Sequence, residues 1–139
     1  MQVNLKLEKK MKITGTNYLG LETIFDTSAK AGGEDSAATP MEIMLESLGA
    51  CSMMDVAAII RKKRKQITKL EAKINAERTE QHPKVFTKVN IKYKLTSPDA
   101  ELKDLERAVE LSQSTYCSVS AMFKSSGCEI ISECELING

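Results

Sequence analysis

Four cysteines are the residues of this chain best suited to redox or nucleophilic chemistry. Gly49 and Ala50 precede Cys51 and leave space beside its sulfur, within a long apolar segment. Cys117 follows Tyr116 at a predicted junction of two helical pieces, where the free N–H groups of a helix N-terminus would favour a thiolate. A cysteine in an apolar segment or a turn is also commonly an inert, small hydrophobic residue. Reactivity therefore depends on whether the fold lowers the pKa of either thiol.

The remaining candidate ligands and bases carry less chemical information. Cys128 and Cys134 have an even spacing on a predicted last strand, so we expect both in the core. His82 precedes Pro83 in a predicted hairpin loop and reads as a solvated side chain. Structural zinc sites bring ligands in closely spaced pairs, which this chain lacks, so we expect neither a metal nor another cofactor. The chain also lacks a glycine-rich phosphate loop and a nucleophile elbow.

Composition predicts a small cytoplasmic protein. The 139 residues suit a single domain over 1–139, and 42% hydrophobic residues can build its core. A net charge of +1 gives no reason to expect nucleic acid as a partner. The most apolar stretch, Pro40–Ile60, is interrupted by Glu42, Glu46 and Asp55, which argues against a membrane span. The N-terminus has no apolar signal region, so we expect free thiols in a reducing cytosol.

The first part of the chain reads as three strands and a loop. Val3, Leu5 and Leu7 alternate with polar residues, which is the period of a half-buried strand. Residues 11–16 and 19–26 predict two more strands. The small, polar residues that follow, 28–38, predict a mobile loop.

A helix start is predicted where this loop ends. Thr39 can cap the helix, Pro40 suits its first position, and Glu42 completes a capping box. The helix should run to about Arg64. Because it is apolar on most faces, we expect a central, nearly fully buried helix.

The rest of the chain alternates strands and helices. Two strands are predicted from alternation over 70–76 and 85–95. A second helix should begin at Ser97 as its cap, break at 116–120 and continue to Lys124, before a last strand that ends near Leu136. The order βββ-α-ββ-α-(α)-β predicts an α+β fold with an antiparallel sheet.

Two segments resemble the signatures of the OsmC/Ohr family, the osmotically inducible and organic hydroperoxide resistance proteins. In that family a proline-led helix carries a cysteine about eleven residues after the proline, as Pro40 and Cys51 do. The segment Tyr116–Ser120 resembles the family's C-P-[VI]-S motif, with Ser118 in place of proline. Together with the order of elements, the resemblance covers nearly the whole chain.

The resemblance implies a specific architecture and activity. Family members are intertwined homodimers, with sheets from both chains around two central helices and each site at the interface. Known members reduce organic hydroperoxides. Carried over, Cys51 would be the attacking thiol and Cys117 the resolving thiol, which would close a disulfide with its sulfenic acid. A dithiol of the lipoyl type would be the expected reductant.

Two departures from the family pattern leave alternatives open. The peroxidase branches have an arginine in the N-terminal half, whereas Arg61 is the first arginine here. They also have a glutamate directly after the proline, where this chain has Met41. Glu42 or Lys30 could substitute for these groups. One alternative to a peroxidase is a non-catalytic relative that binds a small apolar molecule in the same interface pocket. The other is a thiol redox sensor or interaction protein in which the state of Cys51 and Cys117 controls a partner.

Overall fold

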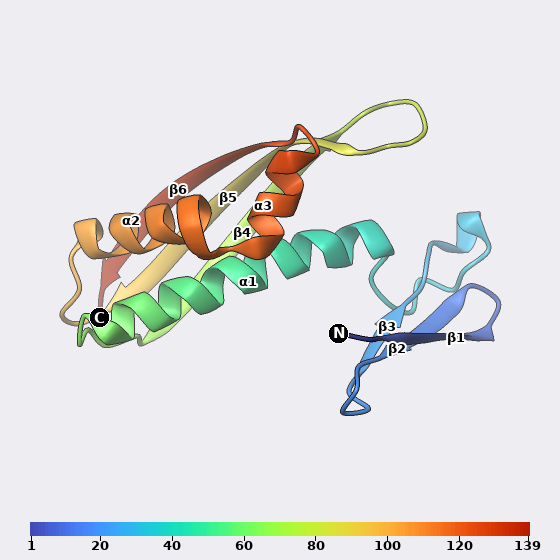
Figure 1. Cartoon of the computed structure of the whole chain (residues 1–139), viewed down its shortest axis with the longest axis horizontal. Helices are drawn as coiled ribbons and strands as arrows, with labels where there is room; N and C mark the ends of the chain where they lie inside the picture. Colours follow the sequence, from blue (N-terminus) through green and yellow to red (C-terminus); the bar gives the residue numbers. More distant parts are fainter. The chain divides into compact units, whose positions relative to one another are not determined.

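A computed structural model describes residues 1–139 and divides them into two compact units, Met1–Glu46 and Ser47–Gly139. The elements follow the predicted order, so the α+β class is confirmed (Figure 1). Long helix α1 begins in the first unit and continues into the second. The single domain over 1–139 stays a prediction.

The first unit is an antiparallel three-stranded sheet. Its strands are β1 (Asn4–Lys9), β2 (Lys12–Thr16) and β3 (Glu22–Phe25), in that spatial order. Leu7 lies opposite Ile13, and Ile13 lies opposite Phe25. Directly opposite side chains share a face, so one face of this sheet is apolar. Leu5 and Leu7 on that face are 65% and 61% exposed in the single chain.

The loop after β3 was expected to be mobile, but Asp26 organises it. The buried Asp26 carboxylate accepts the backbone N–H groups of Thr27, Glu34 and Ser36 at 2.8–3.2 Å. Hydrogen bonds, first of all from the Ser36 hydroxyl, lower the pKa of Asp26 to about 2. Gly33 is required here, because a Cβ at its position would lie 2.1 Å from the Thr27 carbonyl oxygen. The loop includes a short 3₁₀ turn, η1 (Ala29–Ala31).

Helix α1 (Pro40–Lys62) begins at the predicted capping box, which is confirmed. The backbone N–H of Thr39 donates to Glu42 Oε1 at 3.2 Å, and that of Glu42 donates to Thr39 Oγ1 at 3.3 Å. The Thr39 hydroxyl also donates to Glu42, and this bond lowers the pKa of Glu42. The helix therefore starts where local sequence chemistry places it.

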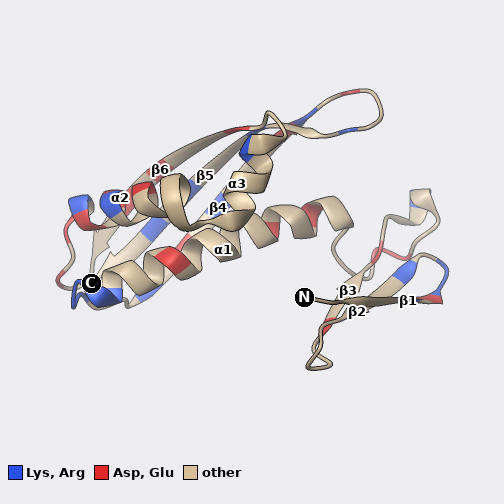
Figure 2. Ribbon diagram, viewed as in Figure 1, with Lys and Arg blue, Asp and Glu red and all other residues tan.

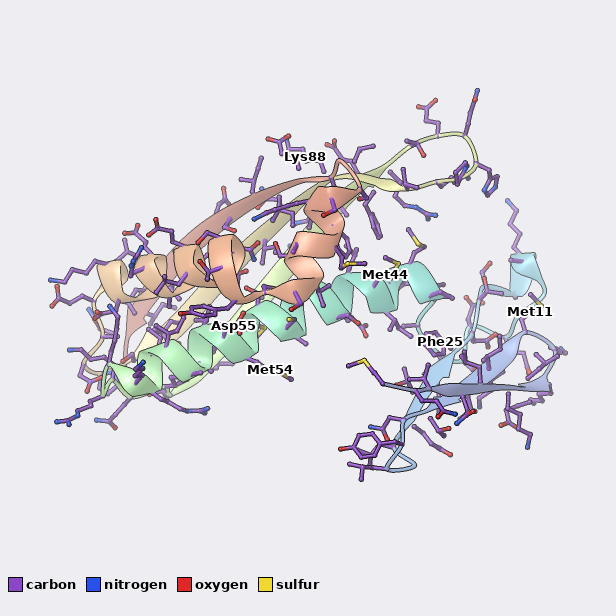
Figure 3. The ribbon with its side chains drawn as sticks, viewed as in Figure 1. Met11, Phe25, Met44, Met54, Asp55 and Lys88 are labelled. Carbon is purple, nitrogen blue, oxygen red and sulfur yellow. The ribbon has the colours of Figure 1, made fainter.

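Within the second unit, α1 buries one stripe and exposes another. Leu48, Ser52, Val56 and Ile60 recur every four residues and are fully buried. Met54, on another face, is 72% exposed and projects away from α2 (Figure 3). Nearly full burial was therefore wrong for the single chain. By length and hydropathy α1 could also cross a membrane, as many core helices could.

The second unit holds a mixed sheet with its helices on one face (Figure 1). Its strands are β4 (Lys69–Arg78), β5 (Phe86–Ser97) and β6 (Glu129–Asn138). The expected antiparallel pairing holds for β4 and β5, whereas β6 runs parallel to β5. The helical crossover between β5 and β6 returns the chain to the same end of the sheet, as parallel pairing requires. The inward side chains of β5 at 89, 91, 93 and 95 are fully buried.

The second helix begins later than predicted. Helix α2 (Leu102–Leu111) starts after Glu101, which forms a capping box with Asp104. Ser97 instead ends β5, and its hydroxyl accepts the N–H groups of Asp99 and Ala100 in a turn. The predicted break after α2 is a π-helical turn, η2 (Ser112–Tyr116), followed by α3 (Ser118–Ser125).

Candidate functional site

Cys117 lies between the end of η2 and the start of α3. Its backbone N–H donates to the Ser112 carbonyl at 2.8 Å, which closes the wide π turn. The residue is the N-cap of α3, and its Sγ accepts the backbone N–H of Ser120 at 3.3 Å. The predicted placement at a helix N-terminus is thus confirmed. Single π turns inside helices are frequent at functional sites.

The electrostatic consequence differs from the prediction, because burial outweighs the helix N-terminus. Cys117 is only 4% exposed, and desolvation raises the pKa of its thiol to about 11, although the Ser120 N–H opposes the rise. The neighbouring Cys51 thiol and the charge of Asp55 add to this rise in the pKa of Cys117. Cys117 is therefore a protonated thiol at neutral pH.

Cys51 lies near Cys117 on a different helix. It lies on α1, is partly exposed, and is close enough to Cys117 to contribute to the raised pKa of that thiol. Asp55 follows one helical turn later on the same side of α1 and turns toward α2 (Figure 3). The structure thus brings together the two cysteines that the sequence singled out, while their chemical roles stay predictions.

A buried polar network surrounds the cysteine pair and was not predicted. Ser52, directly after Cys51, lies with its Oγ 2.6 Å from Tyr93 Oη on β5 and 2.9 Å from Ser112 Oγ. Ser112 Oγ donates to Asp55 Oδ2 at 2.8 Å. Every buried side-chain nitrogen and oxygen has a hydrogen-bond partner. A fully satisfied network of this kind fixes the relative positions of the elements that carry it.

Gln113 completes this network from η2. Its Nε2 donates to Ser52 Oγ at 3.2 Å and to Tyr93 Oη at 2.9 Å, and its Oε1 accepts the Ser120 hydroxyl. The Lys124 ammonium donates to the backbone carbonyl oxygen of Gln113. The ammonium of Lys124 is thereby engaged at the rim of the site.

The other candidates lie elsewhere. Cys128 is buried directly before β6, and Cys134 is half-buried on β6, where burial raises its pKa to about 11. His82 is exposed in the loop between β4 and β5. Glu42 is bonded to Thr39, and Lys30 lies in η1 of the first unit. No group of three His, Cys, Asp or Glu side chains is arranged to hold a metal ion.

These features define an α+β protein in which a thiol on a long helix meets a helix-capping thiol above a mixed sheet. Comparison with known proteins gives the family. Residues 33–133 match the family model of the OsmC-like proteins, and the chain belongs to this family. The resemblance in the sequence is thus confirmed.

Relatives match most or all of the chain's length. It is 33% identical to the protein YhfA of Escherichia coli K12 over 124 residues, which cover 89% of this chain and 90% of YhfA. A crystal structure of a hypothetical protein from Aquifex aeolicus VF5 superposes with a TM-score of 0.84 at 34% identity, covering 98% of this chain and 95% of that one. An organic hydroperoxide resistance protein from Elizabethkingia anophelis superposes with a TM-score of 0.65 at 13% identity, covering 100% and 97%. This last likeness shows the fold alone.

Proposed function

We propose that this chain is a thiol-dependent peroxidase that reduces organic hydroperoxides, with Cys51 attacking and Cys117 resolving. The observation that carries the proposal is the proximity of a partly exposed thiol, Cys51, to a buried one, Cys117, whose pKa it raises. A hydroperoxide can reach the first thiol, and the second waits beside it in protonated form. Family membership supports the same chemistry, since proteins of this fold include organic hydroperoxide resistance proteins.

The reaction has three balanced steps. The Cys51 thiolate attacks the terminal oxygen of ROOH, the O–O bond breaks, and the alkoxide leaves and takes a proton to form an alcohol. The Cys51 sulfenic acid then condenses with the Cys117 thiol to a disulfide and releases water. A dithiol reductant reopens this disulfide by thiol–disulfide exchange and is itself oxidised to a cyclic disulfide.

The environment of Cys117 supports this order of steps. Burial holds the pKa of Cys117 at about 11, and the hydrogen bond and charge of Cys51 contribute to the rise. A neutral sulfenic acid at Cys51 no longer carries that charge. Its formation therefore makes the Cys117 thiol easier to deprotonate, at the moment when the attack on sulfenic sulfur is required.

The partners follow from this chemistry. We expect a cytoplasmic location, where reductants keep thiols reduced between turnovers. A lipoyl-type dithiol is the first reductant to test, because two thiols on one molecule release the product without a persistent mixed disulfide.

The protein is proposed to be a homodimer. A three-stranded sheet needs a covering layer for its apolar face, yet Leu5 and Leu7 remain exposed in the single chain. That face also carries a hollow of about 230 Å³ lined by Leu21 and Phe25, among others. Between Ser47 and Ile60, Asp55 is the single charged residue of helix α1, and Met54 is exposed. The middle of α1 is accordingly mostly uncharged in Figure 2. A second copy of the chain would cover such surfaces.

Titration of free thiols tests the proposal. The reduced protein is treated with one equivalent of cumene hydroperoxide per chain, with hydrogen peroxide in parallel. We expect about two thiols to disappear per chain with the organic peroxide, as sulfenic acid formation followed by closure requires. Cys51→Ser should lose no thiol. Cys117→Ser should lose one and retain a sulfenic acid that dimedone traps.

A non-catalytic small-molecule-binding protein is the second candidate. The exposed Met54 and Met122 favour it, because flexible methionines suit an apolar binding surface. Thiols that persist through a large excess of cumene hydroperoxide would select this candidate over the peroxidase. A redox sensor would instead oxidise rapidly without turnover under any dithiol.

A further inference from the structure

We infer that Gln113 is a positioning residue that holds Cys51 and Cys117 in the arrangement that closes their disulfide. The inference rests on the proposed pairing of these two thiols. It goes further by assigning the closing step to a side chain on a third element, η2, that makes no hydrogen bond to either sulfur.

Gln113 connects the supports of both cysteines. On one side its Nε2 donates to Ser52 Oγ at 3.2 Å, and Ser52 is the residue that follows Cys51 on α1. On the other side its Oε1 accepts the hydroxyl of Ser120. The backbone N–H of that same Ser120 donates to Cys117 Sγ at 3.3 Å. One amide group therefore spans from the helix of Cys51 to the helix turn that holds the sulfur of Cys117.

Two further contacts keep Gln113 in place, one at its side-chain amide and one at its backbone. Tyr93 Oη, fully buried on β5, accepts from Gln113 Nε2 at 2.9 Å. The backbone carbonyl oxygen of Gln113 accepts from the Lys124 ammonium of α3, which holds the main chain of η2 at this residue. The side chain donates through Nε2 and accepts through Oε1 at once, and because these are separate atoms the two bonds fix the orientation of the amide.

The location of Gln113 in η2 explains why its side chain would affect the position of Cys117. The π turn ends at Tyr116, and Cys117 closes it by donating to the Ser112 carbonyl at 2.8 Å. Release of the Gln113 side chain frees this turn from α1 and β5. The distance between the two sulfurs would then vary over a wider range. Because a disulfide forms only within a narrow range of geometries, closure would become less favourable.

Equilibration with glutathione tests the inference without any peroxide. Oxidised glutathione converts the two protein thiols into a disulfide and two reduced glutathione molecules. The fraction of Cys51–Cys117 disulfide, measured by peptide mass spectrometry across glutathione ratios, gives the effective concentration of one thiol at the other. For Gln113→Met, which keeps the side-chain length but not the hydrogen bonds, we expect this effective concentration to fall by about tenfold or more.

Matched variants separate positioning from folding. Ser114→Ala, in the same turn but bonded through its hydroxyl to Thr115 alone, should behave as the wild type. Ser120→Ala keeps the backbone N–H to Cys117 and removes the hydroxyl from Gln113, so it should lower the effective concentration while the chain stays folded. Gln113→Glu still accepts hydrogen bonds but adds a negative charge, which disfavours the Cys117 thiolate. The pH dependence of the rate of disulfide closure should therefore shift to higher pH.

The outcomes distinguish this inference from the proposed function. Equal disulfide fractions in the wild type and in folded Gln113→Met and Ser120→Ala would overturn the inference. A wild type that forms no Cys51–Cys117 disulfide in glutathione would overturn it as well. A wild type that forms the disulfide in glutathione but ignores cumene hydroperoxide would contradict the peroxidase alone and leave the positioning role supported by its variants.

Discussion

The backbone N–H of Ser120 donates to the sulfur of Cys117 over 3.3 Å, yet burial keeps the pKa of that thiol at about 11. We therefore predict that alkylation of Cys117 by iodoacetamide continues to accelerate with pH through pH 10, by about tenfold per unit. Peptide mass spectrometry separates its rate from those of the other cysteines. In Cys51→Ser the midpoint should move to lower pH. A rate that levels off below pH 9 would contradict this assignment.

The hydroxyl of Tyr93 should contribute strongly to stability. It lies 2.6 Å from Ser52 Oγ and accepts from Gln113 at 2.9 Å, and the residue is fully buried. Tyr93→Phe leaves Ser52 and Gln113 without this buried hydrogen-bond partner, so we expect the free energy of unfolding in urea to fall by about 1–3 kcal/mol. Tyr18→Phe is the control, because Tyr18 is 84% exposed and should lose almost nothing. Equal stability of the two variants would show that the network is not maintained in solution.

Acid should weaken the first unit through Asp26. Its pKa falls from 3.8 to about 2 on folding, chiefly through the Ser36 hydroxyl, so the unfolded chain takes up the proton more readily than the folded one. The stabilisation is fully present above about pH 4 and is lost as the pH falls toward 2. Asp26→Asn should melt at a lower temperature than the wild type at pH 6. Its melting temperature should also fall less on acidification, because the variant has no carboxylate to protonate. Glu22→Gln, an exposed control, should follow the wild type.

The apolar face of the first sheet should hold two chains together. Sedimentation equilibrium of the wild type should give about twice the chain mass of 15.4 kDa. Leu5→Glu and Leu7→Glu place charges on that face and should shift the protein toward monomer. Lys6→Glu, on the opposite face of the same strand, serves as the control. A wild-type monomer at every concentration would rule out the proposed homodimer.

Local chemistry explains which parts of the fold could be predicted. Thr39 and Glu42 are close in sequence, so the capping box could be read directly. Ser97 also resembles a cap, but its hydroxyl closes a turn at the end of β5, and local sequence does not distinguish the two uses. The parallel pairing of β6 depends on the path of the whole crossover and carries no local signal.

The site shows the same division. Cys51 and Cys117 could be selected by residue type and context, and the N-cap position of Cys117 follows from the break before α3. The deep burial that raises the pKa of Cys117 could not be predicted from the sequence, because it comes from tertiary packing. Gln113 gave no signal, since its partners Ser52 and Tyr93 lie on elements far away in the sequence.

A peptide map of the oxidised protein tests the central claim most directly. The reduced chain is treated with one equivalent of cumene hydroperoxide, blocked with iodoacetamide under denaturing conditions and digested without reduction. We predict a disulfide between Cys51 and Cys117, with Cys128 and Cys134 fully alkylated. An unoxidised Cys51, or a disulfide that involves Cys128 or Cys134 instead, would contradict the account.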